Sequence, residues 1–579
     1  MRDIRTAETR FPWERWVLSA LLALTLSAAV LQPIRSYDLG WQLAAGRLIV
    51  EERKIPAADV FSFTRAGSPW LDHEWLFQVI GYLLFRAGGW HALLAFSLFL
   101  ALAAYALVAW TLKEERLGGG TLCLLLALSI AGARFRFDAR PEMVSLALMA
   151  VLFFALHASR SPERAKAIWL LPPLFLLWAN AHPSAVLGAA LMLLWLAGEQ
   201  LQRWRERRPS RERGRLAIAL LSPLLLLGNP GGWRLLKIPF EIRSIVKSGH
   251  APNLEWAPPA FAQFPLFYLS VIAGLLVLCV GLRRIDLPPV LVALAATVLA
   301  FQHLRNIGFF FLLLPLALAR PAAFLEERMR IPGRESRLLA AVLLLLVSAH
   351  FFQGNRLAAR RGFLDPIEPR AAVEFIEARG IGKRLFNDVL FGGYLVWRRY
   401  PEHRVFIDGR NEIYDSLLAE IFDSVNDGEK WKLLLERYGI DAALLRRGQM
   451  QAVRYPPSAP GGSVTTELRA FSASHFPASD WALVYWDERA LLFVRRDDAG
   501  ARSLLQAEFR VNPDDVPHTL SLLARGDLDR QKVLEEMDRK IRLEPDSPTA
   551  LRLREMFRSV KVPGRESLMT GGVKVDVPS

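Results

Sequence analysis

The stretch GGWHALLAFSLFLALAAYALVAWTL, residues 88–112, contains no Asp, Glu, Lys or Arg. A helix rises about 1.5 Å per residue, so a stretch of this length can cross the roughly 30 Å hydrocarbon core of a bilayer. Soluble domains seldom contain an uncharged apolar run of this length. We therefore predict a transmembrane helix at this position.

Similar apolar stretches fill the chain before about residue 352 and are rare after it. Because lipid offers no hydrogen-bond partners to the backbone, each stretch is expected to be a helix. Several are shorter than the ~20 residues of a full span, so their ends should extend into flanking residues. The short apolar segment 75–87 is expected to be an interfacial helix that leads into the second span. The predicted spans, about eleven, are 16–34, 88–112, 118–133, 141–158, 168–181, 183–198, 215–229, 265–282, 287–303, 305–324 and 337–352.

The net charge of +15 lies mainly in the loops on one side of these spans. The segments on that side together contain 23 Lys and Arg but only 13 Asp and Glu. They are residues 1–15, 113–118, 159–167, 199–215, 283–286 and 320–337. Such an excess marks the cytoplasmic side of multi-pass proteins. We predict a cytoplasmic N-terminus in a cell inner or plasma membrane, with the C-terminal part periplasmic or extracellular. Nucleic acid is not an expected partner, because the charge is spread over short connections.

Composition excludes several other classes of protein. With 52% hydrophobic residues the chain is not intrinsically disordered. Its two cysteines, Cys123 and Cys279, each lie in an apolar run, which excludes a disulfide-rich scaffold or a cysteine zinc cluster. The first apolar run could be a signal peptide, but the many spans that follow favour a retained helix.

Asp38 directly follows the first predicted span, within the sequence SYDLGW at 36–41. Two interpretations are open. The carboxylate could cap a helix predicted over residues 39–52. Alternatively, it could lie at the mouth of a membrane cavity and act as a general base that takes a proton from an acceptor hydroxyl.

The second outer loop, RFRFDARPE at 134–142, places three arginines on the side where positive charge is not expected. Arg134, Arg136 and Arg140 could bind the phosphate oxygens of a lipid headgroup or a pyrophosphate, because guanidinium groups pair well with phosphate. They could equally extend toward the headgroup region from a helix end. Arg305, at another outer turn, is a fourth candidate cation.

Asp72, His73 and Glu74 are adjacent in the long first outer loop, residues 35–87. These residue types can ligate a metal, but three adjacent residues rarely converge on one ion, which favours a structural hydrogen-bond cluster. We assign no metal site and no cofactor. A divalent metal is compatible with the chain, but no ligand motif supports it.

The order of these features forms a pattern: a basic terminus, one span, a long outer loop opening on an acidic residue, a second loop with acidic residues, many spans and an outer domain. Its local strings are DLGW at 38–41, DHEW at 72–75, RPE at 140–142, WANAH at 178–182, NPG at 229–231, EW at 255–256 and RN at 305–306. Over residues 1–352 the chain resembles the GT-C superfamily of membrane glycosyltransferases, which includes oligosaccharyltransferases, protein O-mannosyltransferases and lipid A aminoarabinose transferases. Gly40 and Trp41 stand where many relatives have paired aromatics, and the double-acidic metal motif of oligosaccharyltransferases is not evident. Sugar, acceptor and metal dependence therefore do not carry over.

The resemblance, to the bacterial type in particular, implies transfer of a sugar from a polyprenyl-phosphate or pyrophosphate carrier to an acceptor on the outer face. Asp38 would be the base, and Asp138 and Glu142 its acidic partners in the second loop. The donor phosphate would be bound by Arg134, Arg136, Arg140 and Arg305. Acceptor-binding or structural roles would fall to Asp72, His73, Glu74 and His182. The implied partners are the lipid bilayer, the polyprenyl-linked donor and an unidentified lipid, glycan or protein acceptor.

After the membrane domain (1–352), short β-type runs alternate with helical stretches, which predicts an α/β soluble domain over 353–500. The predicted strands are 384–388, 394–397, 404–408, 442–445, 482–486 and 490–494. Gly392-Gly393 lacks the spacing of a phosphate loop and is interpreted as a turn. Residues 501–579 are expected to form a helical tail that resembles one tetratricopeptide unit at 526–558, with a mobile end from about 560.

Two other classes of function stay open. A transporter or flippase usually carries ionisable residues near the bilayer midplane, and the predicted spans have essentially none there, which disfavours transport. A non-catalytic membrane scaffold or envelope-assembly protein of the same fold is compatible with the sequence.

Overall fold

The computed structural model describes residues 13–115, 117–208, 213–249, 254–359, 368–455 and 465–559. The chain divides into two compact units. Unit 1 comprises Met1–Asp59, Gly67–Asp365 and Asn411–Ile413, and unit 2 comprises Val60–Ala66, Pro366–Arg410 and Tyr414–Ser579. A short piece of the first predicted outer loop, Val60–Ala66, is thus grouped with unit 2.

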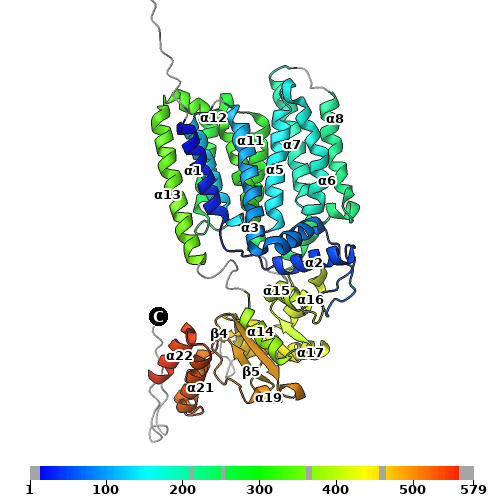
Figure 1. The fold of residues 1–579 in the computed structure, drawn as a ribbon, viewed down its shortest axis with the longest axis vertical. Coiled ribbons are helices and arrows are strands. Elements are labelled where there is room, and N and C mark those ends of the chain that lie inside the picture. Colours follow the sequence, from blue (N-terminus) through cyan, green and yellow to red (C-terminus); the bar gives the residue numbers. More distant parts are fainter. Residues whose placement is uncertain are drawn as a thin grey trace, which may run out of the picture. The chain divides into compact units, whose positions relative to one another are not determined.

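Unit 1 is a bundle of α-helices, most of which run side by side (Figure 1). Every one of the eleven predicted spans contains a helix. The helices are α1 (Trp13–Val30), α2 (Leu39–Glu52), α3 (Trp75–Lys113), α4 (Gly119–Ala133), α5 (Pro141–Ala158), α6 (Leu171–Ala181), α7 (Ala185–Arg205), α8 (Arg213–Leu221), α9 (Ile238–Lys247), α10 (Pro265–Val280), α11 (Leu287–Gln302), α12 (Ile307–Arg328) and α13 (Gly333–Ala359). Short 3₁₀ turns join several of them, including η1 (Arg134–Arg136), η5 (Leu254–Trp256) and η7 (Leu304–Asn306).

Among the described residues, six helices are long and apolar enough to cross a membrane, namely α3, α4, α5, α7, α12 and α13. Three more apolar helices, in α1, α10 and α11, are shorter. The expected multi-pass helical membrane protein is confirmed. The number of eleven spans stays a prediction.

Burial distinguishes central helices from peripheral ones. In the most apolar 18-residue stretch of each helix, the buried share is 72% in α5 and 78% in α12, but 22% in α13. Large apolar side chains on peripheral helices are open, such as Phe99 (63% exposed), Leu276 (62%) and Leu346 (61%). Such surfaces would be unfavourable in water, and lipid chains would cover them.

Helix α3 has a kink at Gly88 and Gly89. Gly89 has φ +60° and ψ −148°, a conformation essentially restricted to glycine. The predicted interfacial helix 75–87 is therefore the first part of α3, and the kink separates it from the apolar span. Helix α2 lies across the ends of the long helices in Figure 1, and its Gln42 Nε2 donates to Glu74 Oε2 at the start of α3 (3.2 Å).

Unit 2 contains a four-stranded sheet of order β1-β2-β6-β5, in which β1 is parallel to β2 and the other pairs are antiparallel. A separate antiparallel hairpin pairs β3 with β4. The strands are β1 (Leu385–Asn387), β2 (Ala442–Arg446), β3 (Met450–Tyr455), β4 (Thr465–Ala470), β5 (Trp481–Trp486) and β6 (Ala490–Arg495). The helices are α14 (Arg370–Arg379), α15 (Val389–Arg399), α16 (Asn411–Ser424), α17 (Gly428–Arg437), α18 (Phe471–His475), α19 (Arg502–Leu505), α20 (Val516–Arg525), α21 (Arg530–Leu543) and α22 (Pro548–Ser559). The expected C-terminal α/β domain is confirmed.

Three predictions for unit 2 are wrong. Residues 394–397 and the pair Gly392-Gly393 lie inside helix α15, which begins where Asp388 accepts a hydrogen bond from Leu390 N (2.8 Å). Residues 404–408 form only an isolated bridge, between Val405 and Ser62. The hairpin β3–β4 was not predicted.

Helices α21 and α22 form the pair expected at 526–558, and they pack on the sheet of unit 2. Lys540 Nζ of α21 donates to the carbonyl of Trp486 at 2.5 Å, and Glu488 accepts from the Thr549 hydroxyl at 2.6 Å. The single helical pair therefore buries one face against the α/β domain. Residues from 560 onward, the expected mobile end, lie outside the described part of the chain.

Candidate functional site

The predicted site residues come from turns and helix ends at one end of the unit 1 bundle. Asp38 lies before α2, Glu74 before α3, Glu142 at the start of α5, His182 after α6 and Arg305 in η7. These helix ends meet because consecutive apolar helices alternate in direction. Residues far apart in sequence thereby reach one region, which we call the site end.

Asp38 precedes α2, but its side chain makes no capping hydrogen bond to the helix backbone. Its Oδ1 instead accepts from the indole Nε1 of Trp41 (3.1 Å). Burial raises the pKa of Asp38 to about 7, although the charge of Arg140 and the Trp41 hydrogen bond act in the opposite direction. A carboxyl that titrates near neutral pH suits general base chemistry. The contacts thus disfavour the capping interpretation.

Arg136 and Arg140 face carboxylates on two different elements. Arg136 contacts Glu142 (Nη2–Oε1, 3.1 Å) and Glu255 (Nη1–Oε1, 3.0 Å). Arg140 contacts the same Glu255 oxygen (2.5 Å) and Asp138 (Nε–Oδ2, 3.6 Å). The two guanidinium groups therefore share one carboxylate oxygen.

Arg305 joins this cluster through Glu142. Its Nη2 lies 3.4 Å from Glu142 Oε1, and its guanidinium carbon lies 4.9 Å from the centre of the Trp256 ring. The ring of His303 contacts the same Trp256 (5.1 Å between centroids). The structure therefore brings Arg136, Arg140 and Arg305 together, with Asp38 in the electrostatic range of Arg140.

Arg134 does not join the other arginines. Its Nη2 donates to Asn355 Oδ1 (2.9 Å), and its guanidinium lies over the ring of Phe351 (4.5 Å), both residues of α13. The short 3₁₀ turn η1 points Arg134 and Arg136 to different neighbours. Asp138 is held nearby, where it accepts from the backbone N–H groups of Arg35 and Ala139.

Glu74 and His182 form a second buried group at the site end. Glu74 Oε1 lies 3.6 Å from His182 Nε2 and 3.8 Å from His73 Nε2. The Nδ1 atom of His182 lies 2.9 Å from the Ser145 hydroxyl and 2.7 Å from the Ser184 hydroxyl. Both hydroxyls are contacts that sequence reasoning did not find.

Burial sets the protonation of this second group. It raises the pKa of Glu74 well above its ordinary value, and nearby carboxylates such as Glu142 act in the same direction. It lowers the pKa of His182 to about 3, so the imidazole is neutral at neutral pH. Burial therefore disfavours the charged forms of both neighbours, the Glu74 carboxylate and the His182 imidazolium.

Asp72 accepts a hydrogen bond from Gln78 Nε2 at 2.6 Å. Within the described residues, no cluster of three His, Cys, Asp or Glu side chains could hold a metal ion. Each of these three adjacent residues has a different hydrogen-bond partner: Asp72 has Gln78, His73 has the Leu71 carbonyl and Glu74 has Gln42.

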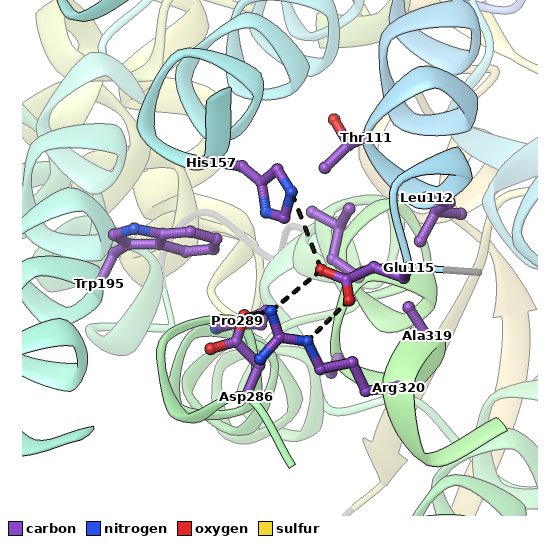
Figure 2. A pocket seen from close by; sticks show the side chains of 11 residues that line it. Thr111, Leu112, Glu115, His157, Trp195, Asp286, Pro289, Ala319 and Arg320 are labelled. Carbon is purple, nitrogen blue, oxygen red and sulfur yellow. Dashed lines mark hydrogen bonds and ion pairs between the residues drawn. The ribbon is translucent and has the colours of Figure 1, made fainter. Parts of the chain in front are cut away.

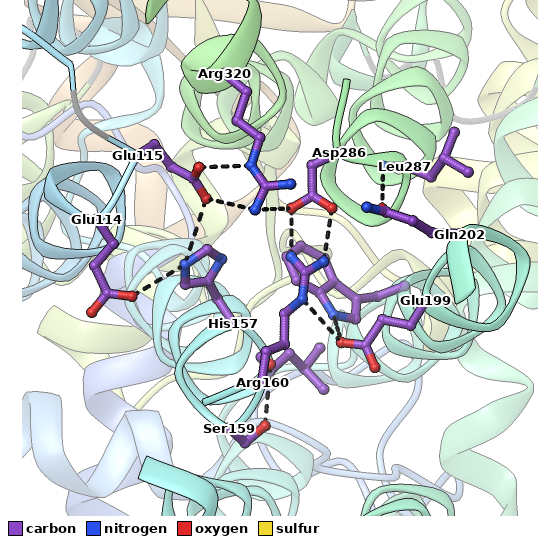
Figure 3. Close-up of polar contacts among 12 residues, drawn as sticks. Glu114, Glu115, His157, Ser159, Arg160, Glu199, Gln202, Asp286, Leu287 and Arg320 are labelled. Carbon is purple, nitrogen blue, oxygen red and sulfur yellow. Dashed lines mark hydrogen bonds and ion pairs between the residues drawn. The ribbon is translucent and has the colours of Figure 1, made fainter. Parts of the chain in front are cut away.

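Figure 3 shows a second network of charges. Glu115 follows the end of α3, Arg160 follows the end of α5 and Asp286 precedes α11, which places the network at the opposite end of these helices from the site end. Arg320 of α12 binds Glu115 (Nε–Oε2, 2.7 Å), and its Nη2 lies 3.5 Å from Asp286. Arg160 binds both oxygens of Asp286, with 2.8 Å from Nη2 to Oδ1. Each of these carboxylates is thus paired with at least one arginine.

The buried core of this network is the pair Glu199 and Arg215. The two Nη atoms of Arg215 reach the two Glu199 oxygens at 2.8 and 3.1 Å. A pocket beside the network is lined by Thr111, His157 and Trp195, with Glu115 between His157 and Arg320 (Figure 2). Because arginines and carboxylates neutralise one another here, we interpret this network as a clamp between helices.

Comparison with known proteins gives matches at the level of structure. No family model and no curated protein matches the sequence. The archaeal oligosaccharyltransferase AglB from Archaeoglobus fulgidus, solved with an inhibitory peptide and a dolichol-phosphate, matches with a TM-score of 0.53 and 11% identity. That match covers 92% of this chain and 86% of the archaeal chain. The chain has the fold of the GT-C membrane glycosyltransferases.

ArnT from Cupriavidus metallidurans, in the apo state, is a second GT-C protein of similar structure. It matches with a TM-score of 0.50 and 12% identity, over 85% of this chain and 98% of the ArnT chain. The apo form of the Archaeoglobus fulgidus oligosaccharyltransferase gives a TM-score of 0.54 at 10% identity. The GT-C resemblance expected from the sequence strings is confirmed, and at these identities it establishes the fold.

Proposed function

We propose that this chain is an integral membrane glycosyltransferase that moves a sugar from a polyprenyl-phosphate or pyrophosphate carrier to an acceptor on the outer face. The observation that carries the proposal is the position of Asp38, a carboxyl with a pKa near 7, beside Arg140 in a group of three arginines. A base and a cation cluster side by side are what transfer from a phosphate leaving group requires.

In the proposed reaction Asp38 takes the proton of an acceptor hydroxyl while the acceptor oxygen attacks the anomeric carbon. The bond from that carbon to the carrier phosphate breaks, and its electron pair stays on the phosphate oxygen. Arg136, Arg140 and Arg305 stabilise the negative charge that develops there. Fixed cations at a site with little water stabilise such a charge more strongly than water does.

The acidic residues of the second loop act through the arginines in this proposal. Asp138 is anchored by two backbone N–H groups and contacts Arg140, so it orients that guanidinium. Glu142 contacts both Arg136 and Arg305 through the same oxygen, Oε1, and so holds them near one another. Both are positioning residues, whereas Arg134, bound to Asn355, stabilises α13.

Glu74, His73 and His182 are proposed to support the acceptor side of the site. The contacts of Glu74 and His182 join residues of α2, α3 and α5 and the start of α7. The carrier lipid would approach from the bilayer, since AglB, a protein of the same fold, was solved with a dolichol-phosphate. The proposed orientation places the N-terminus in the cytoplasm and unit 2 in the periplasm or outside the cell.

A transfer assay tests this proposal. Membranes containing the full chain are supplied with a panel of labelled polyprenyl-phosphate sugars, and consumption of each donor is followed. Wild type should consume at least one donor, Asp38→Asn should lower the rate about 10²- to 10⁴-fold, and Glu51→Gln, an exposed site on α2, should match wild type. A wild type that consumes no donor would favour the scaffold interpretation, and an unaffected Asp38→Asn would remove the proposed base.

A further inference from the structure

Glu255 is the one carboxylate in the described site that bridges Arg136 and Arg140. A single oxygen, Oε1, lies 3.0 Å from Arg136 Nη1 and 2.5 Å from Arg140 Nη1. A phosphate oxygen can be bound by the same arrangement, with two guanidinium groups around one anionic oxygen. The carboxylate of Glu255 thus stands where an anionic ligand of this arginine pair would stand.

The other two carboxylates of the cluster are held more firmly. Asp138 accepts backbone hydrogen bonds from Arg35 and Ala139, and its side chain is 10% exposed. Glu142 belongs to the first turn of α5, contacts two arginines and is 18% exposed. Glu255 comes from the three-residue turn η5 and is the most exposed of the three, at 26%. It is therefore the carboxylate best placed to leave the arginines for solvent.

The ionisation of Glu255 agrees with a role as an anion. Burial opposes its charge, but Arg136 and Arg140 prevail and hold the pKa of Glu255 below its ordinary value. Buried guanidinium groups are unfavourable without counter-charges. Glu142 supplies one to Arg136, and Asp138 supplies one to Arg140. Glu255 adds a further one that both arginines share while no other anion is bound.

We propose that Glu255 is an intramolecular competitor of the donor phosphate: it occupies the Arg136–Arg140 pair in the donor-free state and leaves when a phosphate binds. This inference rests on the proposed function, in which these arginines bind the carrier phosphate. The exchange replaces one anion by another and breaks no covalent bond. An anion that binds the two arginines more weakly than Glu255 does would not displace the carboxylate. The site therefore selects for phosphate groups of high charge.

The competition with Glu255 affects the sugar donor and the released carrier phosphate differently. A sugar attached through a phosphodiester carries one negative charge on the phosphate, and the released polyprenyl monophosphate carries nearly two. Displacement of Glu255 is thus more complete after the sugar has left. Interactions that strengthen as charge develops favour the transition state over the bound donor.

Binding of a polyprenyl monophosphate to the purified full chain in mixed micelles tests the competition. Glu255→Gln should tighten binding about tenfold, because a charge-assisted contact to the arginines is lost from the free state. Glu241→Gln is the matched control, since it removes the same charge from an exposed position on α9, which lies with Glu255 in the connection between α8 and α10. Unchanged or weaker binding in Glu255→Gln, including no binding in either protein, would overturn the proposal.

A second measurement uses the wild-type chain and does not depend on a variant. A water-soluble carbodiimide with an amine labels accessible carboxylates, and mass spectrometry gives the extent at Glu255. Labelling of Glu255 should increase when the polyprenyl monophosphate is bound. A decrease or no change would contradict displacement.

The variant Arg140→Gln separates the two proposals. If it weakens binding of the probe while Glu255→Gln has no effect, the donor site stands and the competitor is rejected. If Arg140→Gln binds the probe as wild type does, the arginine pair is not the phosphate site, and the donor site of the proposed function fails together with the inference.

Discussion

The indole Nε1 of Trp41 donates a hydrogen bond to Oδ1 of Asp38 at 3.1 Å. The two residues are three positions apart, at the start of α2, so one helical turn brings the donor to the carboxylate. Trp41 is itself buried and packs edge-on against Trp70 (6.2 Å between ring centroids). The hydrogen bond favours the charged form of a carboxyl whose pKa burial raises to about 7.

Trp41→Phe should therefore make Asp38 a base that works only at higher pH. Loss of the donor removes a stabilising contact of the carboxylate, which raises its pKa, and a general base acts only when deprotonated. The ascending limb of the pH–rate profile should move to higher pH by about one unit. The rates of the two proteins should converge at alkaline pH, and a limb that moves to lower pH or stays in place would argue against this contact.

Two arginines of the second loop should behave differently when replaced by glutamine. Arg136→Gln should raise the KM for the donor about tenfold, because its guanidinium faces the proposed phosphate position. Arg134→Gln should leave the donor KM unchanged and lower the thermal stability, because its partners are Asn355 and Phe351 of α13. Equal effects of the two substitutions on the donor KM would show that the whole loop, rather than one arginine pair, binds phosphate.

The clamp at the opposite end should contribute to stability through buried charges. Glu199 and Arg215 are 3% and 6% exposed, so Arg215→Met leaves Glu199 buried without this partner and should cost about 3–5 kcal/mol. The double replacement Glu199→Met with Arg215→Met should recover most of that loss. Thermal unfolding of the purified protein measures both.

The control for the clamp is Arg208→Gln. Its contact with Glu206 is at the surface, with Arg208 71% exposed, and its loss should change stability by no more than about 1 kcal/mol. A double replacement that is no more stable than Arg215→Met alone would mean that Arg215 acts through its other contacts, such as the Ser159 hydroxyl.

Gly392→Ala should destabilise unit 2 even though alanine is the better helix former. A Cβ atom at position 392 in α15 would lie 2.2 Å from the Ile407 carbonyl oxygen. The repulsion should cost about 1–3 kcal/mol, which exceeds the gain of about 1 kcal/mol from helix propensity. Gly428→Ala, at the start of α17 with open space around it, should be neutral or slightly stabilising. Calorimetry of the full chain should therefore show a lower unfolding temperature for Gly392→Ala and an equal or higher one for Gly428→Ala. An unchanged or higher unfolding temperature in Gly392→Ala would contradict the close contact.

The same position shows why part of unit 2 could not be predicted. Tyr394 and its apolar neighbours favour a strand locally, and Gly392-Gly393 favours a turn. Tertiary contacts override both tendencies: Asp388 caps a helix, and the glycine permits that helix to approach the 407–408 backbone. The membrane helices were predictable because lipid restricts an uncharged apolar stretch to one regular structure.

The candidate site was predictable to the extent that it depends on helix ends. Asp38, Arg136 and Arg140 follow from charged residues placed next to apolar spans. Glu255 belongs to the string EW at 255–256, which contributes to the resemblance, but no local pattern assigns it a role. It meets Arg140 across 115 positions of sequence. The separation of Arg134 from Arg136 depends on one 3₁₀ turn, which the sequence pattern does not specify.

The pH dependence of kcat/KM tests the central claim, that Asp38 is the base of a sugar transfer, most directly. Wild type should show an ascending limb with an apparent pKa near 7, the value that burial gives to Asp38. Asp38→Asn should retain donor binding, lose about 10²- to 10⁴-fold in rate and lose this limb. A wild-type profile that is flat between about pH 5 and pH 8, or a limb that persists in Asp38→Asn, would contradict the account.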